Sequence, residues 1–365
     1  MTPNSLRPVN AIKPRTGVGG SIPSLRSRSI GLESIGARGT LPLSRRSWIA
    51  RIGGLTLLLA RLPSSNPTHA VSPIQDPTKD LTPRETFLSE ARSAGLGEIR
   101  TYDTERFTCL GDAKIDFIKE ASQLCEAIAR DYERHFQNQG FTLSKSTQRM
   151  TVIILGGPDS YQKLLKRDPG PFGGGLYEID KNRLVLCDAR TSAPDVPPRG
   201  AAGRTNTFVL AHEMMHLLTF NTGLLHRLAD IPLAISEGLA TYGEVRKTKD
   251  RSELGLVNRL RLQAMAIHFQ NGGEWFSLER LLREDGLFQD AASEQMAYAE
   301  AWVLIHELMI DRGRRDGFRD YLATLATRKE SGQRIPDASK HLGDLDRLDA
   351  LLKQTARRFI RSLGS

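Results

Sequence analysis

The residues of this sequence best suited to chemistry are two histidines and a glutamate inside an apolar run. His212, Glu213 and His216 form the pattern H-E-x-x-H within segment 208–220. On a helix, residues four apart lie on one face, so both histidines can bind one Zn²⁺ from the same side. Glu213 lies one step around the helix, where its carboxylate can reach a metal-bound water. The pattern therefore indicates a metal-assisted hydrolase.

A third metal ligand is expected at Glu237, within the helical pattern of segment 235–242. The three-residue motif also occurs by chance in ordinary helices, but buried polar groups are costly unless they are paired or bound to metal. Glu237 follows His216 by 21 residues, enough for one helix to end and a second to return beside it. Two histidines and one glutamate leave the fourth position of a tetrahedral zinc site open to water.

Two residues between these helical segments are alternative third ligands. His226 follows His216 by ten residues, but a lone histidine beyond a helix end is more often a cap or a surface residue. Asp230 stands where the N-cap of the next helix is expected. The metzincin pattern needs Gly three and His six residues after the second motif His. Thr219 and Thr222 occupy those places, which excludes that class.

The motif and its surroundings resemble the gluzincin metallopeptidases, in which H-E-x-x-H is followed by a Glu in an S-E-G-L-A-x-Y setting, here Ser236–Tyr242. The fuller pattern over 208–242 is similar to a bacterial peptidase-like family of unknown function in the same clan (clan MA), and the resemblance extends over about residues 101–310. It implies an α+β, zincin-like metalloprotease fold. In that fold a small mixed sheet and an active-site helix are followed by a mainly helical C-terminal part.

The resemblance also assigns roles to residues. It implies one zinc ion per chain, held by His212, His216 and Glu237, with Glu213 as the general base. The expected function is an exported zinc hydrolase, a peptidase acting on peptide or protein substrates. The alternatives are a zinc hydrolase of a non-peptide amide or ester in the cell envelope, and a non-catalytic binding protein of gluzincin type. A binding module has no need of Glu213, which argues against the last.

A downstream tyrosine that steadies the oxyanion is a further feature of the resembling peptidases. Tyr298, 61 residues after Glu237, is the best match, although composition alone describes an ordinary half-buried helix tyrosine equally well. Some gluzincins place an Asp four residues after the third ligand to orient a zinc histidine. Thr241 stands there, so the sequence names no such partner.

The first 70 residues differ in composition from the rest. They contain ten basic residues and one acid, Glu33, whereas the remainder has 41 of each and is neutral. The net charge of +9 therefore resides in this leader and is no argument for nucleic acid as a partner. Residues 1–43 are rich in Ser, Gly, Pro and Arg with little apolar periodicity, so we expect them to be unstructured.

An export signal is indicated by the end of the leader. Arg45 and Arg46 precede the short apolar segment 52–62, and Thr68–Ala70 offers small residues for cleavage. This order is typical of a twin-arginine signal, and the apolar segment is too short to span a bilayer. We expect residues 1–70 to be read by the twin-arginine machinery and removed, which gives a periplasmic or secreted bacterial protein without a membrane span. The alternative is a disordered basic arm.

The mature part is expected to divide into a linker over 71–100 that ends in a short helix, a catalytic α+β region over 101–250 and a helical C-terminal subdomain over 251–365. Periodicity and turn residues predict strands over 104–110 and 149–155, helices over 113–137, 160–166 and 345–363, a hairpin over 172–186 that turns at 180–182, and a loop over 188–204. Within the hairpin, the resemblance makes Gly174–Tyr177 an edge strand that pairs with the substrate backbone. The glycines allow a bulge or mobile flap equally well.

The three cysteines are expected to be buried free thiols. They are odd in number and far apart, with no C-x-x-C pair, so thiolate zinc is not indicated. Cys109 and Cys187 lie in or at the end of predicted strands, and Cys125 lies on the core face of a predicted helix.

Replacing Arg45 and Arg46 together by lysine should block export and leave the chemistry of the mature protein intact. A receptor reads paired guanidinium groups as planar forks, which lysine does not reproduce, whereas export of an unfolded chain needs only positive charge before the apolar segment. Fractionation of cells carrying a tagged precursor measures the effect. Equal periplasmic signal from wild type and the double variant would favour a general secretion signal, or none, for residues 44–70.

Overall fold

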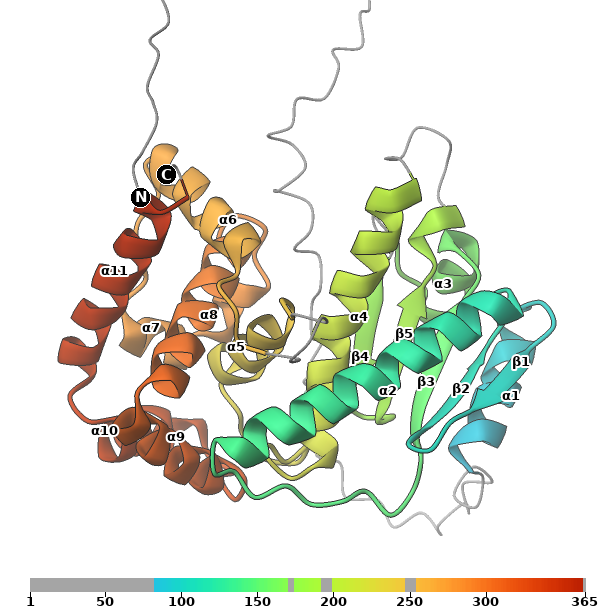
Figure 1. Cartoon of the computed structure of the whole chain (residues 1–365), viewed down its shortest axis with the longest axis horizontal. Coiled ribbons are helices and arrows are strands. Elements are labelled where there is room, and N and C mark those ends of the chain that lie inside the picture. The colour runs from blue at the N-terminus through green and yellow to red at the C-terminus, as the bar shows by residue number, and fades with distance from the viewer. Residues whose placement is uncertain (1–81, 170–173, 192–198, 247–253, 364–365) are drawn as a thin grey trace, which may run out of the picture. The chain divides into compact units, whose positions relative to one another are not determined.

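A mixed sheet and a larger set of helices make up the computed structural model, an α+β arrangement (Figure 1). It describes residues 82–169, 174–191, 199–246 and 254–363, except for the side chains of 199–205. The predicted leader, its twin arginines and the first part of the linker lie outside the described residues.

The sheet has five strands in the order β1-β2-β3-β5-β4. Its three inner strands run parallel, and each edge strand is antiparallel to its neighbour. Every residue of β3 and β5 is buried, as expected where both faces of a sheet are covered. The bounds are Arg100–Asp103 for β1, Phe107–Gly111 for β2, Met150–Leu155 for β3, Gly175–Glu178 for β4 and Arg183–Cys187 for β5.

Helices cover the two faces of this sheet. Alternation along β3 shows the division, because Val152 packs in the core under α2 and α4 while Ile153 packs with α1 and α3. Helix α4, which carries the H-E-x-x-H motif, lies along β4 and β5 (Figure 1). The bounds are Pro83–Ser93 for α1, Ile115–Asn138 for α2, Pro158–Leu165 for α3 and Arg199–Asn221 for α4.

Beyond β5 the described residues contain helices and no strand. Helix α8 is buried from Met296 to Met309 and packs against α5, α6, α9 and α11. None of the helices in the described part of the chain is long and apolar enough to cross a membrane. The bounds are Leu233–Gly243 for α5, Arg259–Gln270 for α6, Leu278–Arg283 for α7, Glu294–Ile310 for α8, Arg312–Leu325 for α9, Arg334–Leu342 for α10 and Leu345–Arg361 for α11, with short 3₁₀ turns at Ala189–Thr191, Asp285–Phe288 and Ser331–Gln333.

Most of the predicted elements are confirmed, with shifts of a few residues at their ends. The structure adds β1, which the sequence analysis did not predict, and shows that the loop expected over 188–204 is wrong for its last residues. Helix α4 already begins at Arg199. Prolines 197 and 198 were taken as loop residues, but proline is compatible with the start of a helix, where its missing N–H has no intrahelical partner.

Two smaller expectations are also confirmed. The three cysteines are free and buried. The hairpin turns where expected, with Asn182 in the left-handed region at φ 48°, a conformation that asparagine tolerates better than most residues. The edge position of β4 agrees with the strand interpretation of Gly174–Tyr177 rather than with a bulge or flap.

Candidate metal centre

The three predicted metal ligands come together between α4 and α5. Nε2 of His212 lies 3.2 Å, and Nε2 of His216 3.3 Å, from the same oxygen of Glu237, Oε2. One donor atom from each residue lies within 4.8 Å of the others, and no other group of His, Cys, Asp or Glu in the described residues shares this arrangement. This buried triad can hold a metal ion.

The chemistry of the donor atoms fits a cation. His212, His216 and Glu237 are each at most 2 % exposed, so water does not compensate their polar atoms. Two imidazole nitrogens and a carboxylate oxygen face one point, and such a set needs a proton or a metal ion at its centre.

The pKa values of these groups show how strongly they interact. Burial alone would lower the pKa of His212, but hydrogen bonds to Glu237 and Glu244 outweigh it and raise the pKa to about 10. Burial would raise the pKa of Glu237, yet His216 and His212 lower it to about 2. A metal ion must therefore displace a proton from this site, so metal binding and proton binding compete.

Glu213 lies beside the triad and is held by the edge strand. Its Oε2 accepts the backbone N–H of Tyr177 at 2.7 Å, and burial raises the pKa of its carboxyl. The close approach of β4 requires glycine at 175, because a Cβ there would lie 2.4 Å from Cγ1 of Val209 and 2.9 Å from Cγ of Glu213. The sheet edge thus fixes the carboxylate that the sequence proposes as a base.

Tyr298 lies near the same centre, on α8. Its ring is 1 % exposed, rather than half-buried, and its centroid is 6.1 Å from that of His212. Burial raises the pKa of its phenol well above the ordinary value, so the group stays protonated and can donate a hydrogen bond. The structure brings Tyr298 to the site, and its role toward an oxyanion stays a prediction.

Glu244 is a residue of the site that the sequence analysis missed. Its Oε1 accepts a hydrogen bond from Nδ1 of His212 at 2.8 Å, which leaves Nε2 of that ring free for a metal. The hydroxyl of Thr241, at the place where some gluzincins carry the orienting Asp, bonds instead to the carbonyl of Gly238 within its own helix. Glu244 follows Glu237 by seven residues, two helical turns, and that spacing was the available signal.

The alternative ligands lie elsewhere. His226 is exposed and is no part of the triad. Asp230 forms an ion pair with Arg334, 2.6 Å between Oδ1 and Nη2. The expectation that Asp230 caps the next helix is wrong, because Asp285 accepts the Leu233 N–H at the start of α5 instead. Arg334 binds both carboxylates, which explains why Asp230 turns away from the helix.

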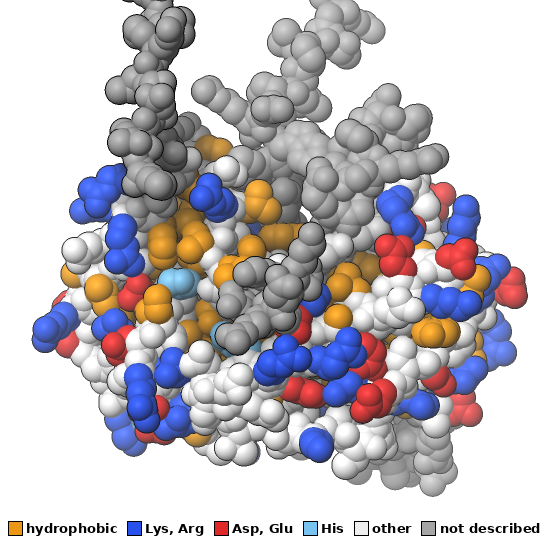
Figure 2. Space-filling view, in the orientation of Figure 1, with side chains coloured by type: hydrophobic (Ala, Val, Ile, Leu, Met, Phe, Trp, Pro, Cys, Tyr) orange, Lys and Arg blue, Asp and Glu red, His pale blue; other side chains and the backbone are white. Residues whose placement is uncertain are grey.

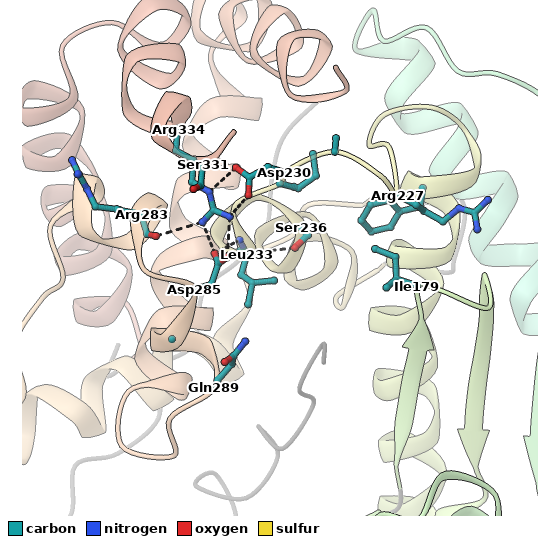
Figure 3. A pocket seen from close by; sticks show the side chains of 14 residues that line it. Ile179, Arg227, Asp230, Leu233, Ser236, Arg283, Asp285, Gln289, Ser331 and Arg334 are labelled. Carbon is teal, nitrogen blue, oxygen red and sulfur yellow. Dashed lines mark hydrogen bonds and ion pairs between the residues drawn. The ribbon is translucent and has the colours of Figure 1, made fainter. Parts of the chain in front are cut away.

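A cavity of about 550 Å³ lies next to the ligands (Figure 3). Ser236, the neighbour of Glu237, lines it, and so does Phe220, one turn beyond His216. In Figure 3 the charged group around Arg334 lies on one side of the cavity and Ile179 on the other. The space-filling view shows how charged and apolar side chains are mixed over the face drawn in Figure 2. The site thus adjoins a space large enough for several side chains of a ligand.

One comparison with known proteins gives a match. The segment 206–331 is similar to a family model described as a protein of unknown function, DUF1570. The matched segment contains the triad, Glu213, Glu244 and Tyr298. No curated protein matches the chain. The site is therefore interpreted from its own chemistry.

The purified protein should contain one metal ion per chain, and His212→Ala or His216→Ala should remove most of it. Each substitution deletes one of three protein ligands at a centre that needs all of them. Elemental analysis by mass spectrometry gives the metal content, and circular dichroism gives the folding control. Metal at nearly one ion per chain in the folded double variant would rule out this site.

Glu237→Ala should weaken metal binding far more than His226→Ala does. Glu237 faces both motif histidines inside the protein, whereas His226 is exposed in the connection between α4 and α5. Titration with a chromophoric chelator measures both affinities, and His226→Ala serves as the matched control. The assignment of the third ligand fails if the two variants exchange these outcomes.

Proposed function

We propose that the protein is a zinc-dependent hydrolase, a peptidase of gluzincin type with a zincin-like fold. The observation that carries the proposal is the convergence of His212, His216 and Glu237 beside the buried carboxylate of Glu213. A set of two nitrogen donors and one oxygen donor suits zinc and leaves a position for water, as in catalytic rather than structural zinc sites.

The residues around the centre divide the work of amide hydrolysis. Bound zinc would supply a water of lowered pKa and polarise the substrate carbonyl. Glu213 takes the proton of the attacking water and returns it to the leaving amine, and its raised pKa suits both transfers. Tyr177 orients that carboxylate through its N–H. Tyr298 donates its hydroxyl proton to the oxygen on which negative charge develops.

A peptide is the substrate class that the surroundings favour. Strand β4 is an edge of the sheet and passes directly over Glu213, so an extended chain could add to the sheet beside the base. The cavity lined by Phe220 and Ser236 offers room for side chains that flank the scissile bond. We further propose export by the twin-arginine route to the periplasm or medium, supported by the order of charge, apolar segment and small residues before position 71.

Glu213→Gln should retain the metal and the fold and lose turnover by at least about 10²–10⁴-fold, because an amide cannot accept the proton of the water. Hydrolysis is measured with a peptide that the wild type cleaves, and metal content is measured on the same samples. A variant that hydrolyses this peptide at the wild-type rate would show that another group is the base.

The substrate class is tested by incubating zinc-loaded protein with a random peptide library and sequencing the products. We expect new peptide termini that are absent from Glu213→Gln. If the wild type leaves the library intact but releases acid from envelope amides or esters, the protein is a zinc hydrolase of another substrate class. If neither substrate reacts while zinc binds, the chain is a binding protein and the proposal fails.

A further inference from the structure

Arg261 on α6 is a buried cation whose contacts converge on the metal centre. The residue is 3 % exposed. Its Nε donates to Oε2 of Glu244 at 3.1 Å and its Nη2 donates to Oε1, the same oxygen that accepts from Nδ1 of His212. A guanidinium that binds both oxygens of a carboxylate fixes the plane of that carboxylate as well as its position. Arg261 is therefore one residue removed from a metal ligand.

The other face of the same guanidinium meets aromatic rings. Its Cζ lies 4.8 Å from the centroid of Tyr298 on α8 and 5.8 Å from that of Phe208 on α4. A cation over an aromatic face is attracted by the ring quadrupole. One side chain thus contacts the helix of the motif, the helix of the third ligand and the helix of the tyrosine.

Asn258 completes the set from the start of α6. Its Nδ2 donates to Oε2 of Glu244 at 2.6 Å and to the carbonyl of Thr241 at 3.2 Å. Its Oδ1 accepts the backbone N–H of Arg261 at 3.3 Å and so caps the helix. Both oxygens of Glu244 are therefore saturated by α6 and His212, which leaves that carboxylate a single position.

Stability alone does not require such a set. A buried ion pair gains little over well-packed apolar residues, because desolvation offsets the attraction of the charges. The direction of His212, by contrast, depends on the group bound to Nδ1, since a histidine whose Nδ1–H is fixed presents Nε2 to the metal.

We propose that Arg261 is a positioning residue of the metal centre, which holds Glu244 against His212 and supports the ring of Tyr298. This inference rests on the proposed function. Arg261 touches neither metal nor substrate, and it acts by fixing the directions of Nε2 of His212 and of the Tyr298 ring. A lysine at this position keeps the charge but lacks the planar fork and its second hydrogen bond.

The test compares Arg261→Lys and the neutral pair Arg261→Met with Glu244→Gln, in the full chain, with Arg259→Met as control. Arg259 is the exposed first residue of the same helix. The pair keeps a hydrogen-bond acceptor for His212 and leaves no unpaired buried charge, so it guards against the case in which Arg261→Met alone fails to fold. The zinc dissociation constant is measured by chelator competition, and the melting temperature is measured on metal-free protein.

We expect zinc binding about 10–100-fold weaker in Arg261→Lys and in the neutral pair, the scale usual for groups that orient metal ligands. The metal-free melting temperature of the pair should stay near wild type, and Arg259→Met should match wild type in both measurements. Wild-type zinc affinity in both Arg261→Lys and the pair would overturn the inference and leave Arg261 a structural cation. A wild type that binds no zinc would instead overturn the proposed function itself.

Discussion

Buried charge is the constraint on which the rest of this structure depends. His212, His216, Glu213 and Glu237 lie where water cannot compensate them, so each must find its partner inside the protein. The partners come from a strand and three further helices, and all must be in place at once for the bonds to form. A metal ion at the triad completes this set, which links metal binding to the packing of the whole centre.

The fold meets this constraint by placing α4 between the sheet and the C-terminal helices. One side of α4 faces β4, whose backbone reaches Glu213, and the other faces α5, which supplies Glu237. Helix α5 is in turn pressed against α8. A Cβ at Gly238 would lie 2.8 Å from the carbonyl oxygen of Ala301, so glycine next to the third ligand permits this contact. The apolar surroundings of the motif follow from burial on both sides.

The orientation of the first histidine is achieved differently here than in gluzincins that place an Asp four residues after the third ligand. Thr241 holds that place and bonds within its helix, and Glu244 takes over from the helix end. A longer acidic side chain at a helix end has more freedom than one inside the helix. The bonds from Asn258 and Arg261 remove that freedom, so the substitution of one residue for another required a second helix to fix it.

The sequence by itself determined what depends on local periodicity. The motif helix, the face shared by His212 and His216, the candidacy of Glu237 and most element types follow from spacings of two, four or seven residues. The tertiary structure decided what depends on contacts between distant segments: that Glu244 meets His212, that Arg261 binds Glu244, and that β4 touches Glu213. Helix and strand periods repeat within an element, whereas the angle and offset between elements are set by core packing, which no single spacing records.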